Sequence, residues 1–278
     1  MSRFDIVVVT FLISLMAVTA CWLYGVRHQQ DLSLIDGYYG FASCIHAGLT
    51  YAIWSHHSTR GLLLTVLICL WALGFGQGLA RRWYAHRGQG GDIRYRTAAE
   101  TLGMNGQGFA WKSYGLAGPQ AVLIAVLNLP IQLAIMSDAG ALKPLDLVGF
   151  VVVAAGGTIE VAANRQLEVF KRTARPGSTL MTGLWAWSRH PNYFGNLCVY
   201  AGAAIVAVSD PGLWWTFVSP VIILVTLRWG FIGTGVSGTD KLMLQKRAGD
   251  PVYLDYLART PAFFPRRPRH GADVQLGA

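Results

Sequence analysis

Long apolar runs, separated by short polar or basic stretches, dominate this chain. Seven of them approach or reach the ~20 residues that a helix needs to cross a ~30 Å hydrocarbon core. These runs cover residues 4–26, 38–54, 61–79, 114–136, 145–163, 193–208 and 213–231. The pattern therefore predicts an all-α, polytopic membrane protein with about seven transmembrane helices.

Composition supports this class. The 278 residues are 53% hydrophobic and only 13% charged, which is typical of a membrane protein. We expect residues 1–265 to form a single transmembrane domain. Residues 266–278 are basic and are expected to form a disordered tail.

The net charge of +9 follows the predicted topology. Most Lys and Arg residues lie in the stretches 81–96, 165–189 and 241–269, whereas the loops at 137–144 and 209–212 carry almost none. This division argues against a nucleic-acid-binding face. By the positive-inside rule, the basic stretches and the C-terminus are cytoplasmic and the N-terminus is outside.

The four cysteines lie singly within apolar spans. Cys21, Cys44, Cys69 and Cys198 form no CxxC or Cys/His spacing. We expect them to be small buried apolar residues, with no metal site and no structural disulfide.

The segment 188–195, Ser-Arg-His-Pro-Asn-Tyr-Phe-Gly, precedes the sixth apolar run. It offers Arg189 and His190 as cationic or donor groups, Asn192 as an amide and Tyr193 as a phenol. Pro191 suits the first turn of the following helix. We interpret the segment as an edge that binds phosphate and amide groups; the alternative is a pair of anchors at the lipid headgroups.

Upstream, residues 160–171 carry the fifth span out of the membrane. Glu160, Asn164, Glu168 and Lys171 share one face of this helix. An ionisable residue such as Glu160 near the end of an apolar span usually faces a protein interior or a watery cavity; the alternative is a snorkelling Glu paired with Lys or Arg.

Basic residues bracket the loop that follows this helix. They could hold nucleotide phosphates or face anionic headgroups, and the aromatic and amide groups after them favour a nucleotide. The four residues are Lys171, Arg172, Arg175 and Arg189.

These motifs, together with Val236-Ser237-Gly238 and Tyr253-x-x-Tyr256, resemble the bacterial steroid 5-alpha-reductase-like membrane proteins of the 3-oxo-5-alpha-steroid 4-dehydrogenase C-terminal superfamily. The match is specific over roughly the last 120 residues. It implies a seven-helix protein of the bacterial inner membrane, in which NADPH in a cytoplasm-facing cavity gives hydride to an activated C=C bond of a steroid-like or other lipid substrate.

The resemblance also implies the site. Relatives commonly carry an acidic residue where this chain has Asn164 and Asn196, and amides can form hydrogen bonds but supply no negative charge. The implied cofactor-binding set, with neighbouring basic residues, is Asn164, Lys171, Arg172, Arg189, His190, Asn192, Tyr193, Asn196, Tyr253 and Tyr256.

Hydride addition requires a proton donor near the developing enolate oxygen. Candidates are Tyr39, His46, Arg82, Tyr84, Asp92 and Tyr95, and we take Tyr39, His46 and Tyr95 as the catalytic set. The expected partners are the hydrophobic substrate and membrane lipids, with no nucleic acid and no metal.

Two other functions stay open. Membrane methyltransferases that use S-adenosylmethionine share a similar Arg-His-Pro-x-Tyr motif, but they generally place paired acidic residues before the last tyrosines, where this chain has only Asp240. The third possibility is a non-catalytic lipid-binding or assembly protein related to such enzymes.

Overall fold

The structure is a computed structural model that describes residues 1–28, 32–86, 100, 103, 109–137, 140–175, 177–230 and 235–267. Within these residues the regular structure is helical throughout and includes no strand. The main elements are α1 (Arg3–His28), α2 (Leu34–Ile53), α3 (Thr59–His86), α5 (Phe109–Ile135), α6 (Pro144–Thr173), η2 (Gly183–Ala186), α7 (Pro191–Ala207), η3 (Pro211–Phe217), α8 (Val218–Trp229), α9 (Gly235–Lys246) and α10 (Pro251–Arg259).

The all-α prediction is confirmed, and each of the seven predicted spans coincides with helical structure. Five segments are long and apolar enough to cross a membrane: α1, α3, α5, α6 and the continuous stretch Pro211–Trp229. The last begins with the 3₁₀ helix η3. Pro211 is its first residue, and Asp210 caps it by accepting a hydrogen bond from the Gly212 amide at 3.2 Å. The shorter helices α2 and α7 have 20 and 17 residues.

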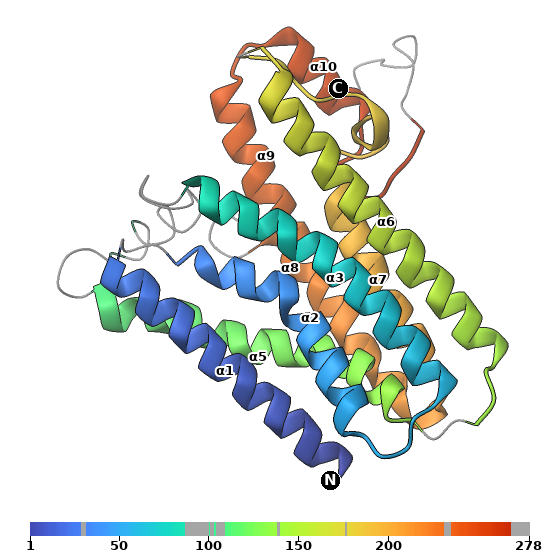
Figure 1. Ribbon diagram of the computed structural model, residues 1–278. Helices are drawn as coiled ribbons and strands as arrows, with labels where there is room; N and C mark the ends of the chain where they lie inside the picture. Colours follow the sequence, from blue (N-terminus) through green and yellow to red (C-terminus); the bar gives the residue numbers. More distant parts are fainter. Residues whose placement is uncertain are drawn as a thin grey trace.

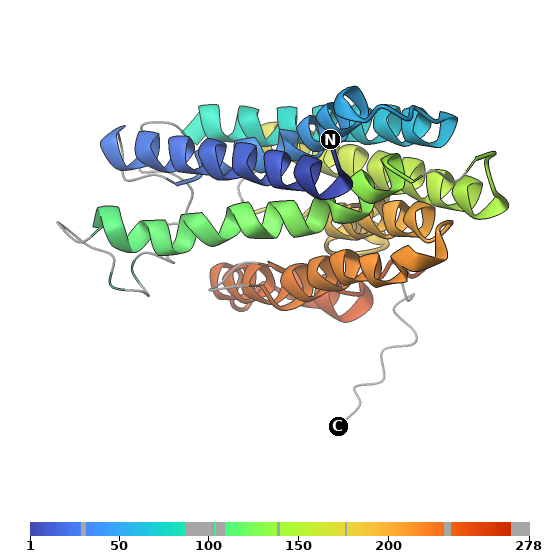
Figure 2. The same cartoon turned by 90° about the horizontal axis from the view of Figure 1, so that it is seen from below.

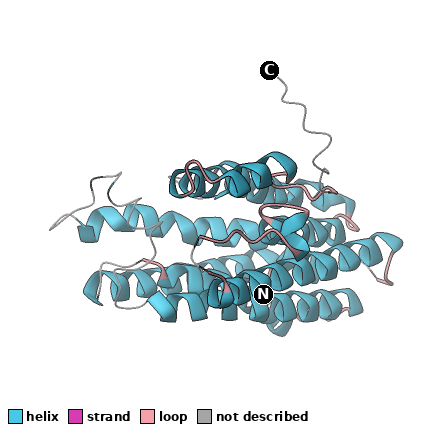
Figure 3. Ribbon diagram, turned by 90° about the horizontal axis from the view of Figure 1, so that it is seen from above, coloured by secondary structure: helices cyan, strands magenta, loops and turns pink. Residues whose placement is uncertain are grey.

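The helices run side by side, with α9, α10 and the C-terminal end of α6 at one end of the bundle and the N-terminus at the other (Figure 1). When the molecule is seen from below, α1, α2 and α3 lie on one side, α8, α9 and α10 lie on the opposite side, and α5, α6 and α7 lie between them (Figure 2). The view from above shows the same layers built from helices (Figure 3). The basic motif segment therefore lies at one end of a helical bundle.

Helices α6 and α7 are in backbone contact through glycines. A Cβ added to Gly195 would lie 2.6 Å from both the Glu160 amide nitrogen and the Gly156 carbonyl oxygen, and one added to Gly202 would lie 2.7 Å from the Val153 amide nitrogen. Small residues at such positions let membrane helices approach closely. This contact fixes the register between the two helices that carry most of the motif residues.

We expect Gly195→Ala to lower the free energy of unfolding by at least about 1 kcal/mol, because the added methyl group forces α6 and α7 apart. Gly48→Ala in α2 is the matched control, since a Cβ there meets nothing within 4 Å. The control should be neutral or stabilising, by up to about 1 kcal/mol. Chemical unfolding in mild detergent measures both; equal stability of the two variants would contradict the close contact.

A buried ion pair joins α3 to α6 at the end of the bundle away from the motif. The Arg60 guanidinium donates to both Asp146 carboxylate oxygens, at 2.9 and 2.6 Å, and both side chains are at most 1% exposed. Arg60 also donates to the Ser137 hydroxyl at 3.0 Å, and Ser209 donates to Asp146. Four segments therefore converge on one charge pair.

The charge distribution gives a topology prediction that labelling can test. In a background without the native cysteines, we expect Arg175→Cys, after α6, to react with a membrane-impermeant maleimide only in permeabilised cells. Ala141→Cys, in the loop before α6, should react in intact cells. Both positions are exposed. The reverse labelling pattern would overturn the predicted orientation.

Candidate functional site

The motif segment is held in place by the C-terminal stretch of the described chain. Ser188 donates its hydroxyl to the Phe263 carbonyl at 2.8 Å, and the Arg189 amide donates to the Pro261 carbonyl at 2.9 Å. The Arg266 amide donates to the Trp187 carbonyl at 3.0 Å, so the first residue of the expected tail is bonded to the domain. Residues 268–278 lie outside the described residues. As predicted, Pro191 is the first residue of α7.

Asp240, on α9, bridges the two cationic residues of the motif. Its carboxylate lies 3.2 Å from the Arg189 guanidinium and 3.0 Å from His190 Nε2. The His190 ring stacks on Tyr193, with the ring centroids 5.2 Å apart and the planes at 16°. Asp240 therefore fixes both side chains at the start of α7.

Tyr253 and Tyr256 lie on α10, the short helix predicted for them, and both are buried. Burial raises the pKa of both phenols, and the Asp240 carboxylate contributes to each shift. The Tyr256 hydroxyl therefore stays protonated, and it donates to the Trp185 carbonyl at 2.8 Å. Both tyrosines therefore lie within electrostatic range of the Asp240 carboxylate.

Between α6 and α7 lies a second group of motif residues. Asn192 donates to the Asn164 side-chain oxygen at 3.0 Å. One helical turn further into the bundle, the Asn196 amide donates to both Glu160 carboxylate oxygens at 3.2 Å, and Trp71 Nε1 donates to Glu160 at 2.7 Å. Glu160 is 2% exposed. It faces the protein interior, as predicted, and the snorkelling alternative with a Lys or Arg partner is wrong.

Hydroxyl groups on α2 and α7 extend the polar group around the Glu160 carboxylate. The Ser43 and Tyr200 hydroxyls are 3.2 Å apart and both side chains are buried. The Tyr39 and Tyr200 phenols lie within electrostatic range of each other and of Glu160. Of the proposed proton donors, Tyr39 is the one that the structure joins to the Glu160 group.

His46 belongs to a different polar group. It is fully buried, and its Nε2 lies 2.7 Å from the Ser14 hydroxyl, which also contacts the Tyr38 hydroxyl at 2.8 Å. These contacts are between α1 and α2. Of the other candidates, Arg82 and Tyr84 are exposed near the end of α3, and Asp92 and Tyr95 lie outside the described residues.

Lys171 and Arg172 lie near the C-terminal end of α6, about 10 Å along the helix axis beyond Asn164. Both are exposed, and Arg172 forms an ion pair with Glu168 on the same helix. Arg175 is exposed as well. The basic residues of this stretch thus face solvent, whereas Arg189 is tied to Asp240.

The cysteine prediction needs a correction. All four cysteines are free, but each is half-buried, and Cys44 and Cys69 contact each other.

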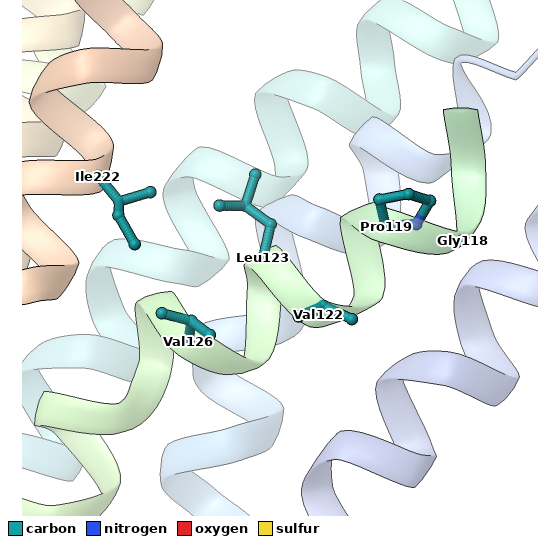
Figure 4. A pocket seen from close by; sticks show the side chains of 6 residues that line it. All are labelled: Gly118, Pro119, Val122, Leu123, Val126 and Ile222. Atoms are coloured by element: carbon teal, nitrogen blue, oxygen red, sulfur yellow. The ribbon is translucent and has the colours of Figure 1, made fainter. Parts of the chain in front are cut away.

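A separate apolar groove of about 520 Å³ opens between α5 and α8 (Figure 4). Its lining is Gly118, Pro119, Val122, Leu123, Val126 and Ile222. It contains no group that could transfer a proton or bind a charge. The polar clusters around Asp240 and Glu160 therefore define the candidate site.

Sequence reasoning missed three members of this site. The sequence indicates Asp240 only as a lone acidic residue before the last tyrosines, and it gives no role for Trp71 or Tyr200. A signal existed for Asp240, because a basic motif needs a counter-charge and Asp240 follows the Val236-Ser237-Gly238 motif by two residues. The other two are revealed only by helix packing.

Comparison with known proteins gives one match. No curated protein and no solved structure matches the chain. The sequence profile of a family described as "Protein of unknown function (DUF1295)" matches residues 21–260, which include α2 to α10 and every described motif residue. The protein therefore belongs to the DUF1295 family.

Proposed function

We infer that this protein is a membrane reductase that uses NADPH to reduce an activated C=C bond of a steroid-like or other lipid substrate. The observation that carries the proposal is a cluster of unpaired polar atoms: of nine buried side-chain polar atoms without a hydrogen-bond partner in the described chain, three lie close together in the sequence, namely Arg189 Nε, Asn192 Oδ1 and Asn196 Oδ1. All three belong to the motif segment and the first turns of α7. Buried polar groups are normally paired, so these atoms suit a bound ligand.

The chemistry of these atoms fits a dinucleotide. The two amide oxygens accept hydrogen bonds, as a carboxamide or a ribose hydroxyl would offer, and a guanidinium donates to phosphate oxygens. Arg189 would hold phosphate, and Asn192 and Asn196 would hold the carboxamide or ribose end. Asp240 orients the Arg189 and His190 side chains through its contacts with both. Fixed contacts of this kind position the reacting groups before reaction.

NADPH, when bound, supplies a hydride. Hydride addition to an enone leaves negative charge on the carbonyl oxygen, and a nearby hydroxyl stabilises that charge by donating a proton. Tyr39 is the favoured donor, because its phenol lies within electrostatic range of Glu160 and of Tyr200, which contacts Ser43. His46 is less suited, because it belongs to a separate polar group between α1 and α2, with Ser14 and Tyr38.

We expect the detergent-solubilised protein to bind NADPH at least tenfold more tightly than NADH. Charge-assisted contacts of about 1.5–3 kcal/mol each to the 2′-phosphate, from the basic residues Lys171, Arg172, Arg175 and Arg189, would give this ratio. Fluorescence titration of the nicotinamide measures it. Arg189→Gln should weaken NADPH binding, and Arg81→Gln, an exposed site on α3, is the matched control.

The same titration separates the alternatives. Equal affinity for NADPH and NADH would remove the argument from the basic cluster. Tight binding of S-adenosylmethionine would support the methyltransferase. Binding of none of the three would support a non-catalytic lipid-binding or assembly protein.

A further inference from the structure

Cys44 on α2 and Cys69 on α3 form a thiol pair that the proposed function does not use. Their sulfur atoms are 3.0 Å apart. A disulfide requires about 2.05 Å, so closing the bond needs a movement of about 1 Å. The other two cysteines, Cys21 and Cys198, have no such contact among the described residues.

The helix packing explains why the two sulfurs meet. Gly40 lies one turn before Cys44, and Gly76 lies two turns after Cys69. A Cβ added to Gly40 would lie 2.5 Å from the Gly76 Cα, so the antiparallel backbones almost touch at this level. One turn further along α2 and two turns back along α3, the same close approach brings the cysteine side chains together.

The pair adjoins the candidate site on both helices. Ser43, which contacts the Tyr200 hydroxyl, precedes Cys44. Trp71, which donates to Glu160, follows Cys69 by two residues. A covalent bond between the two sulfurs would therefore fix α2 against α3 beside the polar network. Both thiols are half-buried, and the adjacent Leu70 is 66% exposed, which leaves a path from the bilayer.

We propose that Cys44 and Cys69 are a redox-responsive pair that a lipid-soluble quinone oxidises to an intramembrane disulfide, locking α2 to α3. The two thiols lose two protons and two electrons as the S–S bond forms, and the quinone takes up both to become a quinol. A thiol reductant reverses the reaction. This proposal does not depend on NADPH binding.

The test uses the purified full chain in detergent micelles, treated with decylubiquinone or with diamide as a second oxidant. After denaturation and alkylation with N-ethylmaleimide, intact mass should show two adducts in place of four, and peptide mapping should join Cys44 to Cys69. The Cys21→Ser/Cys198→Ser variant should still form the bond. It should carry two adducts when reduced and none after oxidation. Cys44→Ser and Cys69→Ser should each keep all three remaining thiols.

The oxidised protein should also melt at a higher temperature than the reduced protein, whereas oxidant should not shift the melting temperature of Cys44→Ser. Four N-ethylmaleimide adducts after treatment with either oxidant, or a disulfide that involves Cys21 or Cys198, would contradict the proposed Cys44–Cys69 pair. If the protein formed the disulfide but kept its melting temperature, the proposal that the bond locks α2 to α3 would be wrong.

Discussion

Asp146→Asn is expected to lower the free energy of unfolding by about 3–5 kcal/mol, because it leaves the Arg60 guanidinium buried without a counter-charge. Arg60 is 1% exposed and Asp146 is fully buried. The loss should appear in chemical unfolding followed by circular dichroism in mild detergent.

Two controls separate charge from packing. Asp255→Asn removes the partner of Arg259 in a half-exposed pair on α10, and such pairs contribute at most about 1 kcal/mol. Arg60→Met combined with Asp146→Leu removes both charges and should recover part of the loss, because paired removal of buried charges costs less than removing one. A loss below about 1 kcal/mol for Asp146→Asn would show that the pair is solvated.

Much of the fold follows from local sequence, and the ion pair shows why the rest does not. Apolar length predicts the spans, and proline predicts where α7 begins. The pairing of Arg60 with Asp146 joins residues 86 positions apart, so no periodicity within a helix can reveal it. Each residue alone is a signal, since a charge at the end of an apolar run needs a partner.

The candidate site, like the fold, is predicted only in part by the sequence. The sequence places Arg189, His190 and Asn192 together because they are neighbours in the chain, and it places Glu160 and Asn164 on one helix face. It does not show that Asp240 would hold the first two, or that Asn196 and Trp71 would hold Glu160. The Asn196–Glu160 contact depends on the α6–α7 register, which glycine packing sets in three dimensions, and the contacts of Asp240 and Trp71 depend on how α9 and α3 pack against these helices.

Asn192→Ala should weaken NADPH binding roughly 5- to 150-fold, which corresponds to the ~1–3 kcal/mol cost of leaving a polar ligand group unpaired. The Asn192 side-chain oxygen is buried and free of partners in the described chain, whereas its nitrogen is bonded to Asn164. The substitution therefore removes a ligand contact and only one internal hydrogen bond. Tyr193→Phe tests the neighbouring phenol, which keeps its ring on His190 but loses its hydroxyl.

Cys198→Ala, two turns further along α7, is the matched control. It retains the Cβ that lies opposite Gly156 and removes only a half-buried sulfur, so both affinity and stability should stay near those of the unmodified protein. Titration and thermal unfolding must be measured on all three variants. If the two motif variants kept their NADPH affinity but lost thermal stability, the motif would be structural. The reductase proposal would then give way to a lipid-binding or assembly role.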